Sequence, residues 1–224
     1  MVYGAGFSGP IFTNLELFME KTALIMIDMQ RGFLDESSPC YIAGAKATVP
    51  ACSKVAKFCR EAGVPVFFVT RLYRENGSDV EHTRFASWLA GGKPISPGCG
   101  ENISSASPAE LEPKKGDYQI LKPRFSAFFG TELDLILRRL GVRTLLLAGT
   151  TTPNCIRTTC YDGISLDYNI AVLSDCTSSA TEEIQRANLL DMANIGAQIL
   201  TSAELMSGAA LKDSLTPAEE YARG

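Results

Sequence analysis

Residues 144–160, TLLLAGTTTPNCIRTTC, hold the pattern that decides the fold. The apolar run 144–148 is typical of a buried parallel strand, and Gly149 ends it. The hydroxyl residues and Pro153 that follow are residues that start a helix, so Cys155 falls in or beside its first turn. Unpaired backbone N–H groups and the positive end of the helix dipole favour a thiolate there. Cys155 is therefore a candidate nucleophile, and the alternative is a small apolar residue that fills the core.

Apolar runs and helical patterns alternate along most of the chain. Short runs that predict strands occupy residues 22–27, 64–70, 118–121, 144–148, 169–173 and 197–200. Helical patterns lie at residues 48–62, 133–140 and 181–194. Strands that alternate with helices pair in parallel, with helices on both faces of the sheet. We therefore predict an α/β fold, a single-domain, three-layer, Rossmann-like arrangement with a six-stranded, mostly parallel sheet.

Length and composition indicate one domain. The chain has 224 residues, of which 46% are hydrophobic, enough to form one substantial core. We expect an irregular N-terminal arm at residues 1–20, the folded domain at residues 21–207 and a C-terminal tail at residues 208–224. Within the domain, residues 85–113 are rich in Gly, Pro and Ser, and a loop of that length is typical of a lid or a subunit contact.

Charge and cysteine content exclude several classes of protein. The net charge of −4 and the pI near 5.2 provide no basic surface for nucleic acid. The seven cysteines are odd in number, form no CxxC pair and follow no secretory leader, which favours a reduced protein. No apolar stretch reaches the roughly 18–20 residues that span a bilayer. We therefore expect a cytoplasmic protein that acts on a small molecule, with no nucleic-acid or membrane partner.

Three polar residues of complementary chemistry follow three of the first four strands. Asp28 follows the first strand, Lys122 ends the third, and Cys155 comes after the fourth. In a parallel sheet these strand ends share one edge, where ligands bind. Asp28 can accept the thiol proton and return it to a leaving amine, while Lys122 orients Asp28 and favours the thiolate. Backbone N–H groups near Thr151 and Cys155 can hold a tetrahedral oxyanion. The alternative for Asp28 alone is a turn cap or a pairing with a nearby base.

Three motifs carry a resemblance to a known family. They are Ile-Met-Ile-Asp-Met-Gln at 25–30, Leu-Lys-Pro-Arg-Phe-Ser-Ala-Phe at 121–128 and Gly-Thr-Thr-Thr-Pro-Asn-Cys at 149–155. Over residues 22–200 the chain resembles the isochorismatase-like cysteine hydrolases. That family includes nicotinamidases, N-carbamoylsarcosine amidohydrolases and ureidoacrylate amidohydrolases.

The resemblance implies roles for particular residues. Asp28, Lys122 and Cys155 would form a catalytic triad. The backbone N–H groups of Thr151 and Cys155 would form the oxyanion hole, beside a cis peptide bond between Thr150 and Thr151. Members of the family are commonly dimers or tetramers, so we expect a homodimer or a homotetramer.

The resemblance implies no metal and no cofactor for this chain. Nicotinamidases of the family bind a metal through an Asp-x-His pair after the second strand, but here residues 71–74 read Arg-Leu-Tyr-Arg. His82 is the single histidine, and it cannot form a site that needs several.

Residues near the strand ends are candidates for substrate binding. An anionic group of the substrate could be bound by Arg71, Arg74 or Arg124. The pocket would be shaped by Phe33, Tyr73, Phe125, Asn154 and Ile156. Solvated arginines and ordinary core or subunit-contact aromatics are the alternatives.

The combined prediction is a metal-independent cysteine amidohydrolase. It would cleave a C–N bond of a small amide, carbamoyl or ureido compound through a covalent acyl-enzyme on Cys155. Three alternatives stay open. They are vinyl-ether hydrolysis of the isochorismatase type, which can dispense with the cysteine; a nicotinamidase; and a catalytically silent homologue that binds a small metabolite or a partner protein.

Overall fold

The computed structural model of the protein describes residues 21–208 and residue 211. The expected N-terminal arm, residues 1–20, lies outside the described residues, and so does most of the expected C-terminal tail.

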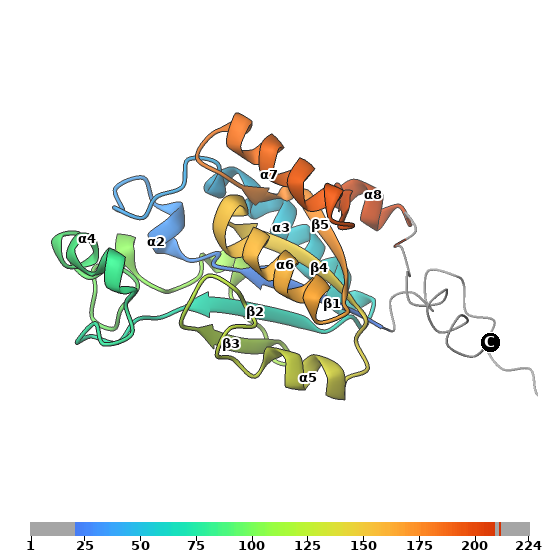
Figure 1. The fold of residues 1–224 in the computed structure, drawn as a ribbon, viewed down its shortest axis with the longest axis horizontal. Helices are drawn as coiled ribbons and strands as arrows, with labels where there is room; N and C mark the ends of the chain where they lie inside the picture. The colour runs from blue at the N-terminus through green and yellow to red at the C-terminus, as the bar shows by residue number, and fades with distance from the viewer. Residues whose placement is uncertain (1–20, 209–210, 212–224) are drawn as a thin grey trace, which may run out of the picture.

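A single six-stranded sheet forms the centre of the molecule (Figure 1). Its strands lie in the order β3-β2-β1-β4-β5-β6, and every neighbouring pair is parallel. Their bounds are β1 Thr22–Ile27, β2 Val66–Arg71, β3 Tyr118–Lys122, β4 Thr144–Thr150, β5 Asn169–Ser178 and β6 Gln198–Leu200. The predicted α/β fold is confirmed, and the sheet is parallel throughout rather than mostly parallel.

The two central strands explain why apolar runs predicted the sheet so directly. Every residue of β1 and of β4 is buried, and the two strands pair from Thr22 and Thr144 to Ile27 and Gly149. Strands covered on both faces have no polar face to alternate with, so their sequences are continuously hydrophobic. All strands of the sheet point the same way, so their carboxyl ends meet along one edge.

Helices cover both faces of the sheet (Figure 1). Their bounds are α2 Arg31–Leu34, α3 Ala45–Glu61, α4 Phe85–Ala90, α5 Leu133–Arg139, α6 Arg157–Ser165, α7 Glu182–Asn194 and α8 Ser202–Met206. One core cluster joins residues of α3 and α8 to one face of β1, and a second joins residues of α5, α6 and α7 to the other. No helix of the described residues is both long and apolar enough to cross a membrane.

The segment 85–113 is folded against the domain. It holds α4 and two short 3-10 helices, η2 Glu101–Ile103 and η3 Ala109–Leu111, and it is preceded by a third, η1 His82–Arg84. Trp88 and Ile95 from this segment are buried in a cluster with Tyr73 and Val80. The backbone N–H of Tyr73 also donates to the carbonyl of Ile95 at 2.8 Å. These contacts attach the segment to the loop that leaves β2.

The fifth strand is longer than the sequence predicted. The polar residues 175–177 were expected to lie beyond its end, but β5 continues to Ser178. The pairing with β4 shifts register between Leu147 and Gly149, and Gly149 then lies opposite Thr177. This irregularity places polar residues in a strand, where a pattern of apolar runs cannot identify them.

Gly149 lies where β4 passes close to the end of β1. Its φ is +116°, and a Cβ at this position would lie 1.9 Å from the carbonyl oxygen of Ile27. Gly149→Ala is expected to lower the free energy of unfolding by about 3 kcal/mol. The added carbon would overlap the backbone of Ile27, and alanine is also disfavoured at this positive φ. Urea denaturation measures the loss.

Gly196→Ala is the matched control for Gly149→Ala. Gly196 has a φ of +107°, but nothing lies within 4 Å of the place a Cβ would take. Its replacement should cost only the conformational penalty of about 1–2 kcal/mol. Equal losses in the two variants would contradict the steric explanation at Gly149.

Candidate active site

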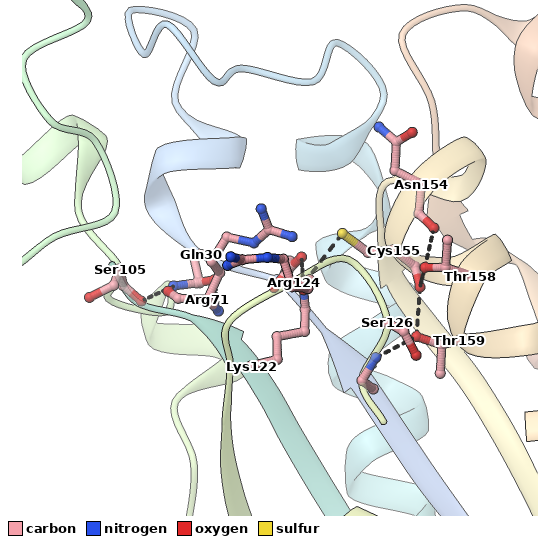
Figure 2. A network of polar contacts seen from close by, with 12 residues as sticks. Gln30, Arg71, Ser105, Lys122, Arg124, Ser126, Asn154, Cys155, Thr158 and Thr159 are labelled. Carbon is pink, nitrogen blue, oxygen red and sulfur yellow. Dashed lines mark hydrogen bonds and ion pairs between the residues drawn. The ribbon is translucent and has the colours of Figure 1, made fainter. Parts of the chain in front are cut away.

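Asp28, Lys122 and Cys155 meet at the carboxyl edge of the sheet. Asp28 directly follows β1, Lys122 is the last residue of β3, and Cys155 lies in η4, Thr152–Ile156, a π-helical turn that follows β4. The Nζ atom of Lys122 lies 2.8 Å from Oδ2 of Asp28 and donates to Sγ of Cys155 at 3.4 Å. Figure 2 shows the lysine side chain and the thiol pointing toward each other. Lys122 and Asp28 are each 1% exposed and Cys155 is 6% exposed, so the three groups interact with little screening by water.

The backbone turns sharply at Asp28. Its φ is +52°, in the left-handed region that aspartate and asparagine enter more readily than most residues. The backbone N–H of Asp28 donates to the carbonyl of Val69 in β2 at 2.9 Å, so the turn stays attached to the sheet. The carboxylate is therefore held by backbone contacts as well as by its pairing with Lys122.

Thr159 connects η4, which carries Cys155, to the loop that follows Lys122. The hydroxyl of Thr159, in α6, donates to the carbonyl of Cys155 at 2.6 Å and accepts a hydrogen bond from the N–H of Ala127 at 2.9 Å (Figure 2). The Nζ of Lys122 also donates to the carbonyl of Arg124 at 3.0 Å. The two elements that carry the amine and the thiol are thus connected by hydrogen bonds.

The bond between Thr150 and Thr151 is a cis peptide, at the position that the family resemblance implied. The hydroxyl of Thr151 donates to the carbonyl of Ser178 at 3.1 Å, and the hydroxyl of Ser178 donates to that of Thr150 at 2.9 Å. The end of β5 therefore supports the turn between β4 and η4.

The acidity of Cys155 differs from the prediction. A helix start was expected to favour the thiolate, but in the structure the pKa of Cys155 is raised to about 11. Burial is the largest cause and the negative charge of Asp28 the next, while Lys122 and Arg71 act in the opposite direction. Removing water from the thiolate costs more than the local positive charges return. In the resting site the proton therefore remains on sulfur at neutral pH, next to a carboxylate that can take it.

A pH dependence follows from the raised pKa. Only the thiolate is alkylated, and raising the pKa lowers its fraction at neutral pH. The rate of alkylation of Cys155 by iodoacetamide should therefore rise about tenfold per pH unit above pH 7 and level off only near pH 11. The rate is measured by mass spectrometry of the peptide that contains Cys155. A plateau below pH 9, the ordinary range of a free cysteine, would contradict this assignment.

A cavity of about 220 Å³ opens beside the thiol. Asp28, Thr151 and Cys155 line it, together with five of the predicted substrate-binding residues, Phe33, Arg71, Tyr73, Phe125 and Asn154. Its other lining residues are Thr150, residues 39–42, Arg84 and Ile95. The cavity is smaller than the roughly 300–1,000 Å³ of common ligand pockets, so it suits a small substrate.

The remaining three predicted substrate-binding residues do not line this cavity. Arg74 extends into solvent, with 76% of its side chain exposed. Nη1 of Arg124 donates to the carbonyls of Asp79 and Pro123, each at 2.7 Å. Ile156 is completely buried in the core.

Gln30 is a positioning residue that sequence reasoning missed. Its side chain donates to the carbonyls of Arg71 and Ser105 at 2.7 and 2.9 Å, and it accepts a hydrogen bond from the N–H of Arg71 at 2.9 Å. Figure 2 shows the amide between these two segments. The signal in the sequence was a polar residue two positions after Asp28, but nothing in the sequence indicates that it is completely buried.

Arg71, the last residue of β2, forms an ion pair with Glu81 in the loop that follows. Nη1 of Arg71 donates to the Tyr73 hydroxyl at 2.6 Å and to Oε1 of Glu81 at 2.8 Å, and the Tyr73 hydroxyl donates to Oε2 of Glu81 at 2.6 Å.

Within the described part of the chain, no group of three or more His, Cys, Asp or Glu side chains could hold a metal ion.

Comparisons with known proteins agree on one family. The model of the isochorismatase domain matches residues 22–204. A probable inactive nicotinamidase of Arabidopsis thaliana is 41% identical over 186 residues, 80% of this chain and 92% of the relative. The ureidoacrylate amidohydrolase RutB of Azorhizobium caulinodans is 31% identical over 218 residues, 85% of this chain and 91% of the relative. The crystal structure of an isochorismatase family protein from Desulfovibrio vulgaris has a TM-score of 0.78 at 39% identity, over 83% of this chain and 96% of that one.

Proposed function

This chain belongs to the isochorismatase family, and from that premise we propose that it is a metal-independent cysteine amidohydrolase. Its substrate would be a small amide, carbamoyl or ureido compound, and the reaction would cleave a C–N bond through an acyl-enzyme on Cys155. The observation that carries the proposal is the position of the Lys122 amine, within 2.8 Å of Asp28 and 3.4 Å of the thiol, beside a small cavity.

The first half of the proposed reaction makes the acyl-enzyme. Asp28 takes the thiol proton while sulfur attacks the carbonyl carbon, so a C–S bond forms and the carbonyl electron pair moves to oxygen. The backbone N–H groups of Thr151 and Cys155 stabilise this oxyanion. When the oxyanion collapses, the C–N bond breaks and the leaving nitrogen takes the proton from Asp28. Ammonia or an amine departs and a thioester remains.

The second half hydrolyses the thioester. Asp28 takes a proton from water while the water oxygen attacks the acyl carbon, and the same N–H groups hold the second oxyanion. Collapse releases the acid, and the thiol recovers its proton. Lys122 keeps Asp28 oriented through their ion pair, and its positive charge favours negative charge on sulfur during the attack.

The relatives support this chemistry at the level of reaction class. The RutB relative is named for hydrolysis of ureidoacrylate, which has the ureido group of the proposed substrate class. The name of the Arabidopsis relative states that it is a probable inactive nicotinamidase, so we propose an amide other than nicotinamide. An assembly of two or four copies remains a prediction.

Ammonia release tests the proposal. The enzyme is incubated with nicotinamide, N-carbamoyl amino acids, ureidoacrylate-like acids, biuret and simple amides, and ammonia is measured over time. Release from at least one carbamoyl, ureido or simple amide compound is expected. Release from nicotinamide alone would overturn the proposal in favour of a nicotinamidase. Release from no compound of the screen would overturn it in favour of vinyl-ether hydrolysis or a silent binding protein.

A further inference from the structure

Arg71 carries hydrogen-bond donors that the protein leaves unused. The residue is 2% exposed, yet its Nε and Nη2 atoms have no hydrogen-bond partner among the described residues. Only Nη1 is engaged, by Tyr73 and Glu81. Buried polar groups are almost always bonded, so unpaired donors next to a cavity indicate a partner that arrives from outside.

The guanidinium is held in place before any ligand arrives. Gln30 bonds both backbone polar groups of Arg71, and the Tyr73–Glu81 pair holds Nη1. The guanidinium also lies over the ring of Phe125, with its carbon 4.8 Å from the ring centroid. Little side-chain freedom remains to be lost on binding, which strengthens each contact with a ligand.

The charges around the cavity favour an anion. Arg71 and Arg84 line the cavity. Lys122 does not line it, but its amine contacts two lining residues, Asp28 and Cys155. The Asp28 carboxylate already pairs with Lys122, and that of Glu81 with Arg71. With the thiol protonated, positive charge exceeds negative charge at the cavity, so an anionic substrate group completes the balance.

We infer that Arg71 binds a carboxylate of the substrate through Nε and Nη2, so that the enzyme acts on small amides or ureido compounds that also carry an acid group. The inference rests on the proposed function for the reaction itself. A planar carboxylate matches the two parallel N–H directions of a guanidinium edge. The cavity of about 220 Å³ leaves room for an acid group and an amide only in a short molecule. Arg71 thus distinguishes acid amides from neutral ones of the same shape.

Matched substrate pairs test the inference during turnover. Succinamate and succinamide differ only by a carboxylate in place of an amide, as do N-carbamoylglycine and its amide. The acid of each pair is expected to have a kcat/KM about 10- to 100-fold higher, the range for hydrogen bonds to a charged group. Arg71→Gln should remove this advantage, mainly by raising KM for the acid. Equal rates within each pair in the wild type would overturn the inference and leave the proposed amidohydrolase intact.

Labelling of Cys155 tests the same point without turnover. Iodoacetate and iodoacetamide differ by the same charge, and their relative rates at Cys155 are compared with those of the same cysteine in urea-unfolded protein. The folded wild type should favour iodoacetate about tenfold or more over this reference. Arg71→Gln should return the ratio to the reference, Arg71→Lys should give an intermediate value, and Arg74→Gln, whose side chain is 76% exposed, should leave it unchanged.

The ratio separates carboxylate binding from the alternative that Arg71 only tunes the acidity of the thiol. A change in thiol pKa alters both rates equally and cancels in the ratio. A preference for iodoacetate that persists in Arg71→Gln would assign it to Lys122 and overturn the inference. If Arg71→Gln does not fold, Arg71→Lys takes its place, and a ratio in Arg71→Lys equal to that of the wild type would overturn the inference. If no amide is hydrolysed but the preference exists and depends on Arg71, the carboxylate site stands and the proposed reaction fails.

Discussion

Cys155→Ala is expected to lower kcat/KM for amide hydrolysis by about 10⁴-fold or more. The variant removes the atom that forms the covalent bond in the proposed reaction. The residual rate would come from substrate binding and the oxyanion contacts alone. The measurement is ammonia release from the best substrate of the screen.

Cys99→Ser is the matched control for this loss. Cys99 is also a free cysteine; unlike the buried Cys155 it is partly exposed, and it does not line the cavity. Its replacement should leave the rate within about twofold, as surface substitutions away from a site usually do. If Cys155→Ala kept most of the activity, the covalent mechanism would be wrong and the vinyl-ether alternative would be favoured.

Lys122→Met is expected to lower the free energy of unfolding by about 3–5 kcal/mol and to abolish hydrolysis. The amine and the Asp28 carboxylate are almost completely buried, so removing the amine leaves an uncompensated charge. The same change removes the donor to Cys155 and the positive charge that favours the thiolate. Urea denaturation measures the stability and ammonia release the activity.

A double variant separates the two effects of Lys122. In Lys122→Met combined with Asp28→Asn the buried charge is gone, and asparagine tolerates the φ of +52° at position 28. Most of the lost stability should return, while activity should stay absent because the proton acceptor is missing as well. A double variant that is no more stable than Lys122→Met alone would show that the loss comes from packing and not from the unpaired carboxylate.

The central strands could be predicted from sequence because their physics is simple. A strand covered on both faces must be apolar, and β1 and β4 are apolar from end to end. The meeting of Asp28 and Lys122 could also be predicted, since parallel strands end at one edge. The polar end of β5 could not, because its pairing depends on a register shift opposite Gly149.

The burial of Cys155 and Arg71 could not be predicted from the sequence, and the chemistry of the site depends on it. A helix start favours a thiolate, but the surroundings of Cys155 include segments far away in sequence, such as residues 39–42 and Phe125, which line the same cavity. Arg71 and Arg74 are both arginines near the end of the second strand, and the sequence does not distinguish them. In the structure Arg71 is the last residue of β2 and is buried, while Arg74 lies in the following loop and extends into solvent. Unpaired donors on Arg71 are likewise a property of three-dimensional packing.

Lys122 belongs to β3, one of the two outer strands of the sheet. Among residues 21–208, β3 has β2 on one side and no strand on the other, and outer strands open more readily than central ones. Transient fraying of β3 would withdraw the amine while β1 and β4 keep Asp28 and Cys155 in place. We therefore expect gentle heating to abolish the proposed hydrolase activity reversibly, at temperatures below the global melting transition of the protein.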